Sequence, residues 1–332
     1  MSIYELMKKE WKTYCLMSSI IYIEEMSKPT EHIQIKKVKE KVYPCLCFHS
    51  IRLKMNNQEI TKLIFDITKN WEKTKKIKFI GESFKNIKKS NWDNQDYFFL
   101  SPQWINSILS ECGKIPNEYS YKTAIKRIGH LKQYPKKPIN ENKNLFVLLL
   151  KNKKLAAGAF IISLDLECRG VQNGKPTLCM SEKYKDFLEF MLKVAKKWNW
   201  TNNITLSTVA VEYSKKLGIK ASPQYELRIN TNGLKEIYSL AGPLANSFKD
   251  KCIRFNINRS NHFQKHGRTI KRGESKQKIM AEIKAKRNLT TTNLQFATGI
   301  GTDVVLDHLR NLEKEGKIKK ERMGKRYIWN LK

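Results

Sequence analysis

Two carboxylates behind an apolar run are the residues with the clearest potential for chemistry. Asp165 and Glu167 follow Leu155–Leu164, a run rich in alanine, glycine and isoleucine. Carboxylate oxygens are preferred ligands of Mg²⁺, and a bound divalent ion can activate water and stabilise charge on a phosphoryl group. Asp165 lies nearer the end of the run, so it is the better candidate for a metal ligand.

The elements that would position these acids form a regular series between residues 145 and 250. Asn173-Gly174 favours a tight hairpin, because both central residues of such a turn need a positive φ. Apolar spacing predicts the helices and residue alternation predicts the strands. The expected α+β order is helix, hairpin, helix, hairpin, helix, over Leu155–Leu164, Leu164–Arg169, Pro176–Met180, Tyr184–Trp198, Ile204–Glu212, Tyr225–Asn230 and Leu234–Phe248.

This order, opening with a small-residue helix that ends in acids, resembles the LAGLIDADG homing-endonuclease domain over about a third of the chain. The resemblance implies a four-stranded saddle over the DNA major groove and a first helix that packs against a twin. It also implies a Mg²⁺ site with Asp165 as ligand, and catalytic roles for Asp165, Glu167 and Lys249, the lysine lying near the scissile phosphate. Arg169 and Arg228, in the expected strands, are candidates for DNA contact.

The motif departs from the family pattern. Ser163 occupies the position where the family places its acid, and the usual acid–glycine pair is missing. Either the helix register is shifted and Asp165 serves, or the metal site is degraded. A further alternative is that Asp165 and Glu167 are strand residues that face solvent or DNA.

The charge of the whole chain points to a polyanionic partner. There are 64 Lys+Arg against 31 Asp+Glu, a net charge of +33. Nucleic acid is the usual partner of so basic a chain; an AT-rich genome also raises the lysine content, but it does not explain clusters of arginine. The seven scattered cysteines contain no Cys-x-x-Cys pair, and no apolar run reaches the length of a membrane span. We therefore expect a soluble, cytoplasmic protein with reduced thiols and no small-molecule substrate.

The flanking regions are expected to be attachments to the central domain. Residues 1–100 form an accessory domain of unclear fold, with helices at Tyr4–Glu25 and Gln58–Thr74. Residues 101–138 contain two short helices, Gln103–Cys112 and Ser120–Ile128 with Ser120 as cap, followed by a basic linker; they are either a helix-turn-helix or a plain helical hairpin. Residues 251–274 are a basic linker that either follows phosphates or is a solvated spacer, with candidate DNA contacts at Arg254, Arg259, Arg268, Lys271 and Arg272.

The C-terminal segment, residues 275–332, carries the most specific pattern. Three short helices and two strands are expected, with Thr302 capping the third helix and Gly316 closing it. The series His308-Leu-Arg-Asn-Leu312, then Gly316-Lys-Ile318, resembles the winged helix-turn-helix of bacterial and archaeal regulators. That resemblance implies DNA contacts on the third helix and on the hairpin, and the alternative is a module for protein contacts. The candidates are Thr302 and Arg310, with Asp303 and Asp307 beside them, and Lys319, Lys320, Arg322, Lys325 and Arg326.

Two functions remain open from the sequence. One is a sequence-specific double-stranded DNA-binding protein of the LAGLIDADG type that cleaves DNA with Mg²⁺. The other is a non-catalytic transcriptional regulator that keeps a degenerate LAGLIDADG scaffold and reads DNA through its winged helix. A single small-residue helix predicts a homodimer paired through Leu155–Leu164, unless a second, eroded copy in residues 1–130 makes a monomer.

Overall fold

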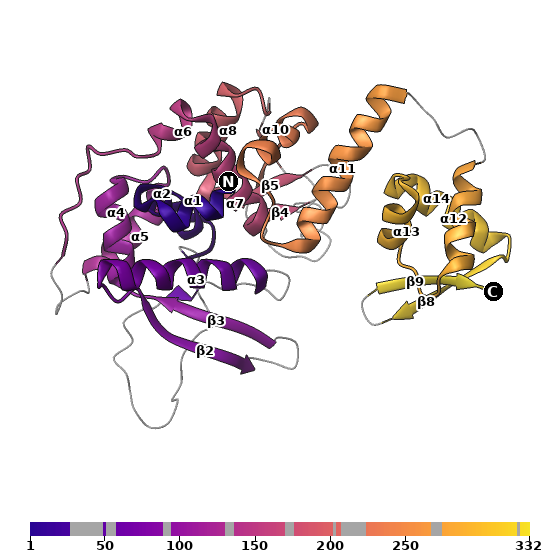
Figure 1. Ribbon diagram of the computed structural model, residues 1–332, viewed down its shortest axis with the longest axis horizontal. Helices are drawn as coiled ribbons and strands as arrows, with labels where there is room; N and C mark the ends of the chain where they lie inside the picture. Colours follow the sequence, from indigo (N-terminus) through magenta and orange to yellow (C-terminus); the bar gives the residue numbers. More distant parts are fainter. Residues whose placement is uncertain are drawn as a thin grey trace. The chain divides into compact units, whose positions relative to one another are not determined.

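The computed structural model divides the chain into two compact units (Figure 1). The first comprises Met1–Arg169 with Pro176–Asp250, and the second includes Lys251–Lys332. The structure describes residues 1–26, 49–50, 58–88, 94–129, 136–169, 176–201, 204–206, 224–266, 274–323 and 326–332. Helices and antiparallel sheets occur together, as the α+β prediction requires. Across these ranges no helix is long and apolar enough to cross a membrane.

The first unit is built from two halves with matching element order. The first half holds α1 (Ile3–Lys9), α2 (Trp11–Ile21), the π-helical turn η1 (Tyr22–Met26), β1 (His49–Ser50), α3 (Gln58–Lys75), β2 (Ile80–Lys88), β3 (Asn94–Leu100), α4 (Pro102–Cys112) and α5 (Glu118–Gly129). The second half holds α6 (Val147–Lys151), α7 (Lys153–Glu167), β4 (Cys168–Arg169), β5 (Thr177–Ser181), the 3-10 turn η4 (Glu182–Tyr184), α8 (Lys185–Lys197), β6 (Ile204–Leu206), β7 (Gln224–Arg228), α10 (Thr231–Ala241) and the start of α11 (Ser247–His266). Residues 1–129 are called the first half below, and residues 136–250 the second half.

The three strands of the first sheet have the same order as three of the four strands of the second. The first half has the order β1-β3-β2, and the second has β4-β5-β7-β6, with every neighbouring pair antiparallel. Thus β1, β3 and β2 match β5, β7 and β6 in both chain order and position. In the second sheet Leu178 pairs with Leu227, and both side chains are fully buried.

Both halves begin with a short helix that breaks into a longer one. The break is a single extended residue, Glu10 at φ −118° and ψ 113°, or Asn152 at φ −125° and ψ 105°. The long helices α2 and α7 contact each other, with α4 against α2 and α10 against α7. A Cβ atom at Gly158 in α7 would lie 2.3 Å from Cδ1 of Ile3, so the absence of a side chain lets α1 approach this closely.

The packing of the middle helices repeats at the level of single atoms. The indole Nε1 of Trp71 in α3 donates to the carbonyl of Met7 at 2.8 Å, and that of Trp198, just after α8, donates to Leu149 at 3.0 Å. Met7 and Leu149 occupy equivalent places in the two short helices α1 and α6. An indole donor at the equivalent position is therefore satisfied in the same way in each half.

The helix that follows each sheet is capped identically. Ser101 and Asn230 are the N-cap residues of α4 and α10, and each accepts from the backbone N–H three residues on. Their own N–H groups donate to the carbonyls of Phe79, at 2.7 Å, and Trp200, at 2.8 Å. Serine and asparagine are interchangeable caps, which is why the match is visible in the structure and hidden in the sequence.

A glycine and an asparagine close both helix pairs. Gly113 and Gly242 follow α4 and α10 with φ of 74° and 86°. At the same spacing, Asn117 and Asn246 accept from the N–H groups of Ser120 at 2.8 Å and of Lys249 at 2.9 Å, and so cap the next helix. The first unit is therefore an internal duplication.

The halves are interlocked through the last helix of each. Asp186 in α8 accepts from the N–H of Glu118 at the start of α5, at 2.7 Å. Glu59 in α3 accepts from the N–H of Ser247 at the start of α11, at 2.6 Å. A carboxylate at a helix N-terminus is favoured by the helix dipole, and here it comes from the opposite half in both cases.

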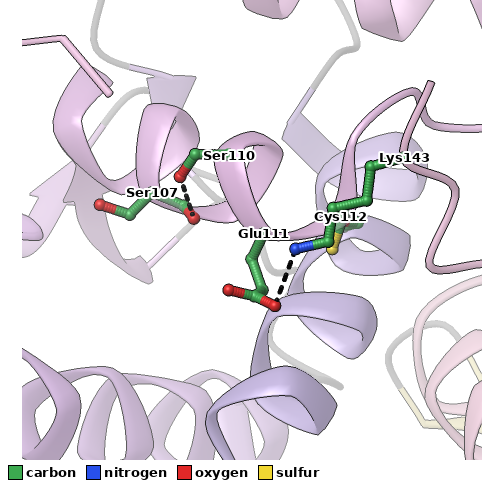
Figure 2. A network of polar contacts seen from close by, with 6 residues as sticks. Ser107, Ser110, Glu111, Cys112 and Lys143 are labelled. Carbon is green, nitrogen blue, oxygen red and sulfur yellow. Dashed lines mark hydrogen bonds and ion pairs between the residues drawn. The ribbon is translucent and has the colours of Figure 1, made fainter. Parts of the chain in front are cut away.

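The segment between the halves is held along α4 and α5. Asn106 both donates to and accepts from the backbone of Lys137, at 3.0 and 2.8 Å. Lys143 Nζ lies 3.0 Å from a carboxylate oxygen of Glu111, and the Ser110 hydroxyl donates to the carbonyl of Ser107 on the same helix. Figure 2 shows both contacts. The pair α4–α5, expected as a helix-turn-helix or a helical hairpin, thus closes the first half and corresponds to α10–α11.

The second unit packs three helices on a hairpin. It contains α12 (Glu274–Ala285), α13 (Thr291–Thr298), α14 (Thr302–Lys314), β8 (Ile318–Met323) and β9 (Arg326–Leu331). A capping box joins Thr290 and Asn293 at the start of α13. The core is formed by apolar side chains from all of these elements, Ile279, Ile283, Leu289, Leu294, Ile300, Val305, Leu309, Leu312, Ile318 and Trp329.

The helices and hairpin expected in this segment are confirmed, with one change of cap. Gly299 and Gly316 have the positive φ expected of turn and cap glycines, 72° and 68°. Gly301, not Thr302, is the N-cap residue of α14. The Thr302 hydroxyl instead donates to the side chain of Gln295 at 2.8 Å, which ties α14 to α13.

Three boundaries in the first unit differ from the prediction. Residues 164–167 are helical, not strand, because α7 is enclosed on several sides and its residue alternation does not mark an exposed face. The expected helix Leu234–Phe248 is two helices, since Gly242 and Pro243 end α10. The cap of α5 is Asn117 rather than Ser120, which lies inside the helix.

Other predicted segments have mixed outcomes. The helices α3, α4 and α8 are confirmed. The segment expected as a basic linker is helical as far as His266. The part of the expected strand Ile204–Glu212 that follows residue 206 lies outside the described residues.

Candidate functional site

Asp165 lies buried near the end of α7 with its carboxylate engaged by three donors. Its exposed fraction is 0%. The Tyr4 hydroxyl and the Ala245 N–H donate to Oδ2, the latter at 2.9 Å, and the Asn246 N–H donates to Oδ1 at 2.9 Å. The carboxylate thus joins α1, α7 and the segment between α10 and α11. We call this set, Tyr4, Asp165, Ala245 and Asn246, the carboxylate clamp.

The side chain of Lys249 contacts backbone carbonyls at the same end of α7. Its Nζ donates to the carbonyl of Leu164 at 3.1 Å and to that of Asp165. The last carbonyls of a helix lack partners within it and attract cations. The sequence-based prediction placed Lys249 beside a scissile phosphate; in this arrangement it caps the C-terminus of α7.

Burial dominates the protonation of the clamp. Removal from water raises the pKa of Asp165 to about 6, against the opposing effects of the Tyr4, Asn246 and Ala245 hydrogen bonds and of the Lys249 charge. Burial, with the adjacent Asp165 charge, raises the pKa of Tyr4 well above its usual value. Both shifts have the sign expected when a charged form loses hydration. Tyr4 therefore stays a hydroxyl donor over the physiological range.

The first half carries an acid at the corresponding helix end. Glu24 lies in η1, just beyond α2, and is 1% exposed. Its charge acts on Tyr4 and raises the pKa of that residue further. Glu24 lies one residue further from the break at Glu10 than Asp165 lies from the break at Asn152. The π-helical turn accommodates this extra residue, so Glu24 corresponds to Asp165. Glu24 was not predicted as a site residue, because residues 1–100 contain no recognisable motif.

The donors around the two acids are not equivalent. Phe146 takes the place of Tyr4 in the second half, and Pro116 takes the place of Ala245 in the first. Phenylalanine has no hydroxyl, and proline has no N–H. The duplication therefore supplies Asp165 with two donors that it cannot supply to Glu24.

The clamp does not fit a metal ion at Asp165. Two of its donors approach Oδ2 and one approaches Oδ1, so the positions that a cation would need are largely taken by hydrogen atoms. Among the described residues, no three His, Cys, Asp or Glu side chains gather into a group that could hold a metal. Glu167 ends α7 immediately before β4, and only its backbone is described.

The predicted strand arginines share one row of the second sheet. Arg169 in β4 pairs with Thr177 in β5, and Thr177 pairs with Arg228 in β7. The Arg228 side chain is 62% exposed and lies 3.2 Å from a carboxylate oxygen of Glu226. The sheet thus brings together two arginines that are far apart in the chain.

The remaining basic candidates fall on α11 and on the second unit. Arg254 is exposed on α11, and Arg259 lies on the same helix. Lys319, Lys320 and Arg322 lie on β8, Arg326 begins β9, and Arg310 is exposed on α14. Arg268, Lys271, Arg272 and Lys325 lie outside the described residues.

The small-residue face of α7 is covered within the same chain. Helices α1 and α2 of the first half lie against it, and Gly158 receives Ile3. Ala156, Ala157 and Ala159 are fully buried. The surface expected to form a homodimer through Leu155–Leu164 is therefore covered within the chain, by helices from residues 1–130, where the alternative prediction placed a second copy.

Comparison of the chain with models of known protein families, with curated proteins and with solved structures finds no significant match to any of them.

Proposed function

We propose that the protein binds double-stranded DNA through the duplicated first unit, in the manner of a LAGLIDADG domain pair within one chain. The observation that carries the proposal is the contact of α2 with α7, each followed by an antiparallel sheet in which three strands have a matching order. Two related sheets, each following one helix of a contacting pair, suit a pseudo-twofold ligand such as duplex DNA. The net charge of +33 favours a polyanion.

The C-terminal unit is proposed to be a winged helix that adds to this binding. Its helices α12, α13 and α14 precede the β8–β9 hairpin, in the order that the module requires. An isolated antiparallel β-bridge between Leu289 and Trp329 joins the backbone that precedes α13 to strand β9 of the hairpin. The cations Lys319, Lys320 and Arg322 on β8 supply charge for phosphate contacts.

Between the two open functions, the clamp favours binding without cleavage. Asp165 is engaged by protein donors, which supports the non-catalytic regulator with a degenerate scaffold. A second candidate is a Mg²⁺-dependent endonuclease in which Glu167 replaces Asp165 as the acid, because Glu167 is the residue at which α7 meets the sheet. In that case Mg²⁺, when bound, would supply charge stabilisation at the scissile phosphate.

Two measurements test the proposal in sequence. Selection from a random DNA library with the full chain, followed by anisotropy titration, is expected to recover a defined duplex site whose affinity falls steeply with salt. Equal affinity for every duplex would refute sequence-specific binding, and no binding at low salt would refute DNA as the ligand. Incubation of the selected site with Mg²⁺ then separates the two candidates: intact DNA supports the regulator, and cleavage that Glu167→Gln abolishes supports the endonuclease.

A further inference from the structure

The C-terminal unit separates its charges between the helix and the hairpin. Helix α14 carries three acids, Asp303, Asp307 and Glu313, against two bases, Arg310 and Lys314. Strand β8 carries three bases, Lys319, Lys320 and Arg322, against one acid, Glu321, and β9 begins with another base, Arg326. In a chain of +33, a net negative helix stands out against its surroundings.

The exposed face of α14 is poorly suited to a phosphate-lined groove. Asp307 and Arg310 are 71% and 67% exposed and lie 3.6 Å apart, so the acid partly neutralises the base. Val304 is 45% exposed on the same helix. Entry of this face into the major groove would place Asp303 and Asp307 near phosphates and cost like-charge repulsion.

The C-terminal part of β9 is held in place by several hydrogen bonds. Trp329 is 3% exposed, its N–H donates to the carbonyl of Leu289 at 2.9 Å, and its indole Nε1 donates to Thr291 at 3.2 Å. Asn330 donates to Glu321 at 2.9 Å and to Asn288 at 3.1 Å. The bonds to Leu289, Thr291 and Asn288 hold β9 against the segment that leads into α13, and the bond from Asn330 to Glu321 joins β9 to β8.

The outer part of the hairpin presents bases with an aromatic ring. Register pairs Lys320 with Trp329 and Arg322 with Tyr327, so all four share the face on which Trp329 is buried in the core. Lys320, Arg322 and Tyr327 are exposed on the same face, beyond the core. Lys320 Nζ lies 3.9 Å from the centre of the Tyr327 ring, a cation–π contact that orders the lysine. Tyr327 is 52% exposed. Its hydroxyl is a further donor of the kind that contacts DNA phosphates.

We infer that the β8–β9 hairpin, and not helix α14, is the element of the C-terminal unit that binds duplex DNA, with Lys320, Arg322 and Tyr327 at the contact. The inference rests on the proposed DNA binding and specifies which surface performs it. A two-stranded ribbon is narrow enough to enter a DNA groove or to lie along its edge. In this arrangement α14 faces away from the phosphates.

The test compares variants of equal charge in the full chain. The hairpin variant is Lys320→Ala with Arg322→Ala, and the matched control is Arg310→Ala with Lys314→Ala on α14. Each is titrated against a mixed-sequence DNA duplex over a range of salt. We expect the hairpin variant to lose about tenfold in affinity and to lower the salt slope by about two, as two lost phosphate contacts require. The α14 variant is expected to bind like the wild type.

Further variants that change the charge of α14 or of the hairpin test which of the two lies at the phosphates. Asp303→Asn with Asp307→Asn removes two negative charges: unchanged affinity supports the inference, and tighter binding would place α14 at the phosphates and overturn it. Arg322→Glu is expected to weaken binding more than Arg322→Ala, and equal affinity of all hairpin variants with the wild type would also overturn it. Thermal unfolding of each variant shows whether it is folded. Failure of the wild type to bind any duplex would instead refute the proposed function itself.

Discussion

The hydroxyl of Tyr4 donates a hydrogen bond to the carboxylate of Asp165, a residue 161 positions further along the chain. The bond crosses between the halves, because Tyr4 belongs to the first helix of one and Asp165 to the long helix of the other. It closes the carboxylate clamp that also includes the backbone N–H groups of Ala245 and Asn246. Asp165, which was predicted from the sequence to be a metal ligand, therefore joins α1, α7 and the segment between α10 and α11.

Removing the Tyr4 hydroxyl should weaken the fold measurably. Tyr4→Phe leaves the ring in place but takes one donor from a buried carboxylate, a loss of about 1–3 kcal/mol. Urea unfolding of the full chain measures the change. Tyr327→Phe is the matched control, since Tyr327 is 52% exposed and its hydroxyl lies outside the clamp. Equal stability of the two variants would show that the Tyr4–Asp165 bond contributes nothing.

The clamp also predicts a pH dependence with a defined sign. The pKa of Asp165 is raised from 3.8 to about 6 in the folded protein, so the folded state binds the proton more tightly than the unfolded state. The stabilisation is complete below pH 4 and is lost as pH rises through about 6, amounting to about 3 kcal/mol. The free energy of unfolding of the wild type relative to Asp165→Asn should therefore fall between pH 4 and pH 7. A relative stability that rises over this interval would contradict the clamp as described.

A close approach between the halves can be tested with two glycines. Gly158→Ala would place a methyl group 2.3 Å from Cδ1 of Ile3, and overpacking of this kind costs about 1–3 kcal/mol. Gly129→Ala, at the end of α5, has no heavy atom within 4 Å of the added carbon and should be close to neutral. Melting curves of the two variants compare them directly. A neutral Gly158→Ala would mean that α1 does not pack closely on α7.

How much of this was predictable depends on which physical feature carried each element. Helix α8 follows from apolar periodicity and the strands β5 and β7 from their residue patterns, and α14 follows from its leucine spacing and the glycine that closes it, Gly316. The duplication was hidden in the sequence because equivalent positions keep the same structural role but not the same residue type. Ser101 and Asn230 cap alike, and Trp71 and Trp198 donate alike, while the chain between them differs in length. The spacing of Ser101, Gly113 and Asn117 recurs unchanged in Asn230, Gly242 and Asn246.

The site was predictable in part for a related reason. Asp165 stood out because an acid after an apolar run is rare enough to notice. Its partners did not, since two are backbone N–H groups and the third, Tyr4, is distant in sequence. A residue type indicates what chemistry a side chain can perform, and the donors around it decide what it does perform. Those donors depend on tertiary packing, which local patterns do not encode.

The equivalence of the halves predicts a penalty at both equivalent caps. Asn117→Ala and Asn246→Ala each remove a side-chain acceptor from the first turn of α5 or α11, at a cost of about 1 kcal/mol. Asn117→Ala also removes a donor to the Lys183 carbonyl, at 2.9 Å, and to Asp186. We expect both variants to lose stability in urea unfolding and to keep a single transition, because the halves are interlocked through Asp186 and Glu59. Two separate transitions would show that the halves unfold independently.

The last prediction concerns assembly. The small-residue helix α7 already has its partner, α2, inside the same chain, so the surface that would have formed a homodimer is buried. We expect light scattering to give the mass of one chain, 39.0 kDa, in free solution across a range of protein concentrations. On a selected DNA duplex, the complex should contain one chain per site, since one chain already supplies both sheets.

Substitution of Ala159 by leucine should then lower the free energy of unfolding rather than dissociate a dimer, because this side chain is fully buried within the unit. A protein that sediments as two chains, and that Ala159→Leu converts to one chain without loss of fold, would contradict the internal pairing of α2 with α7.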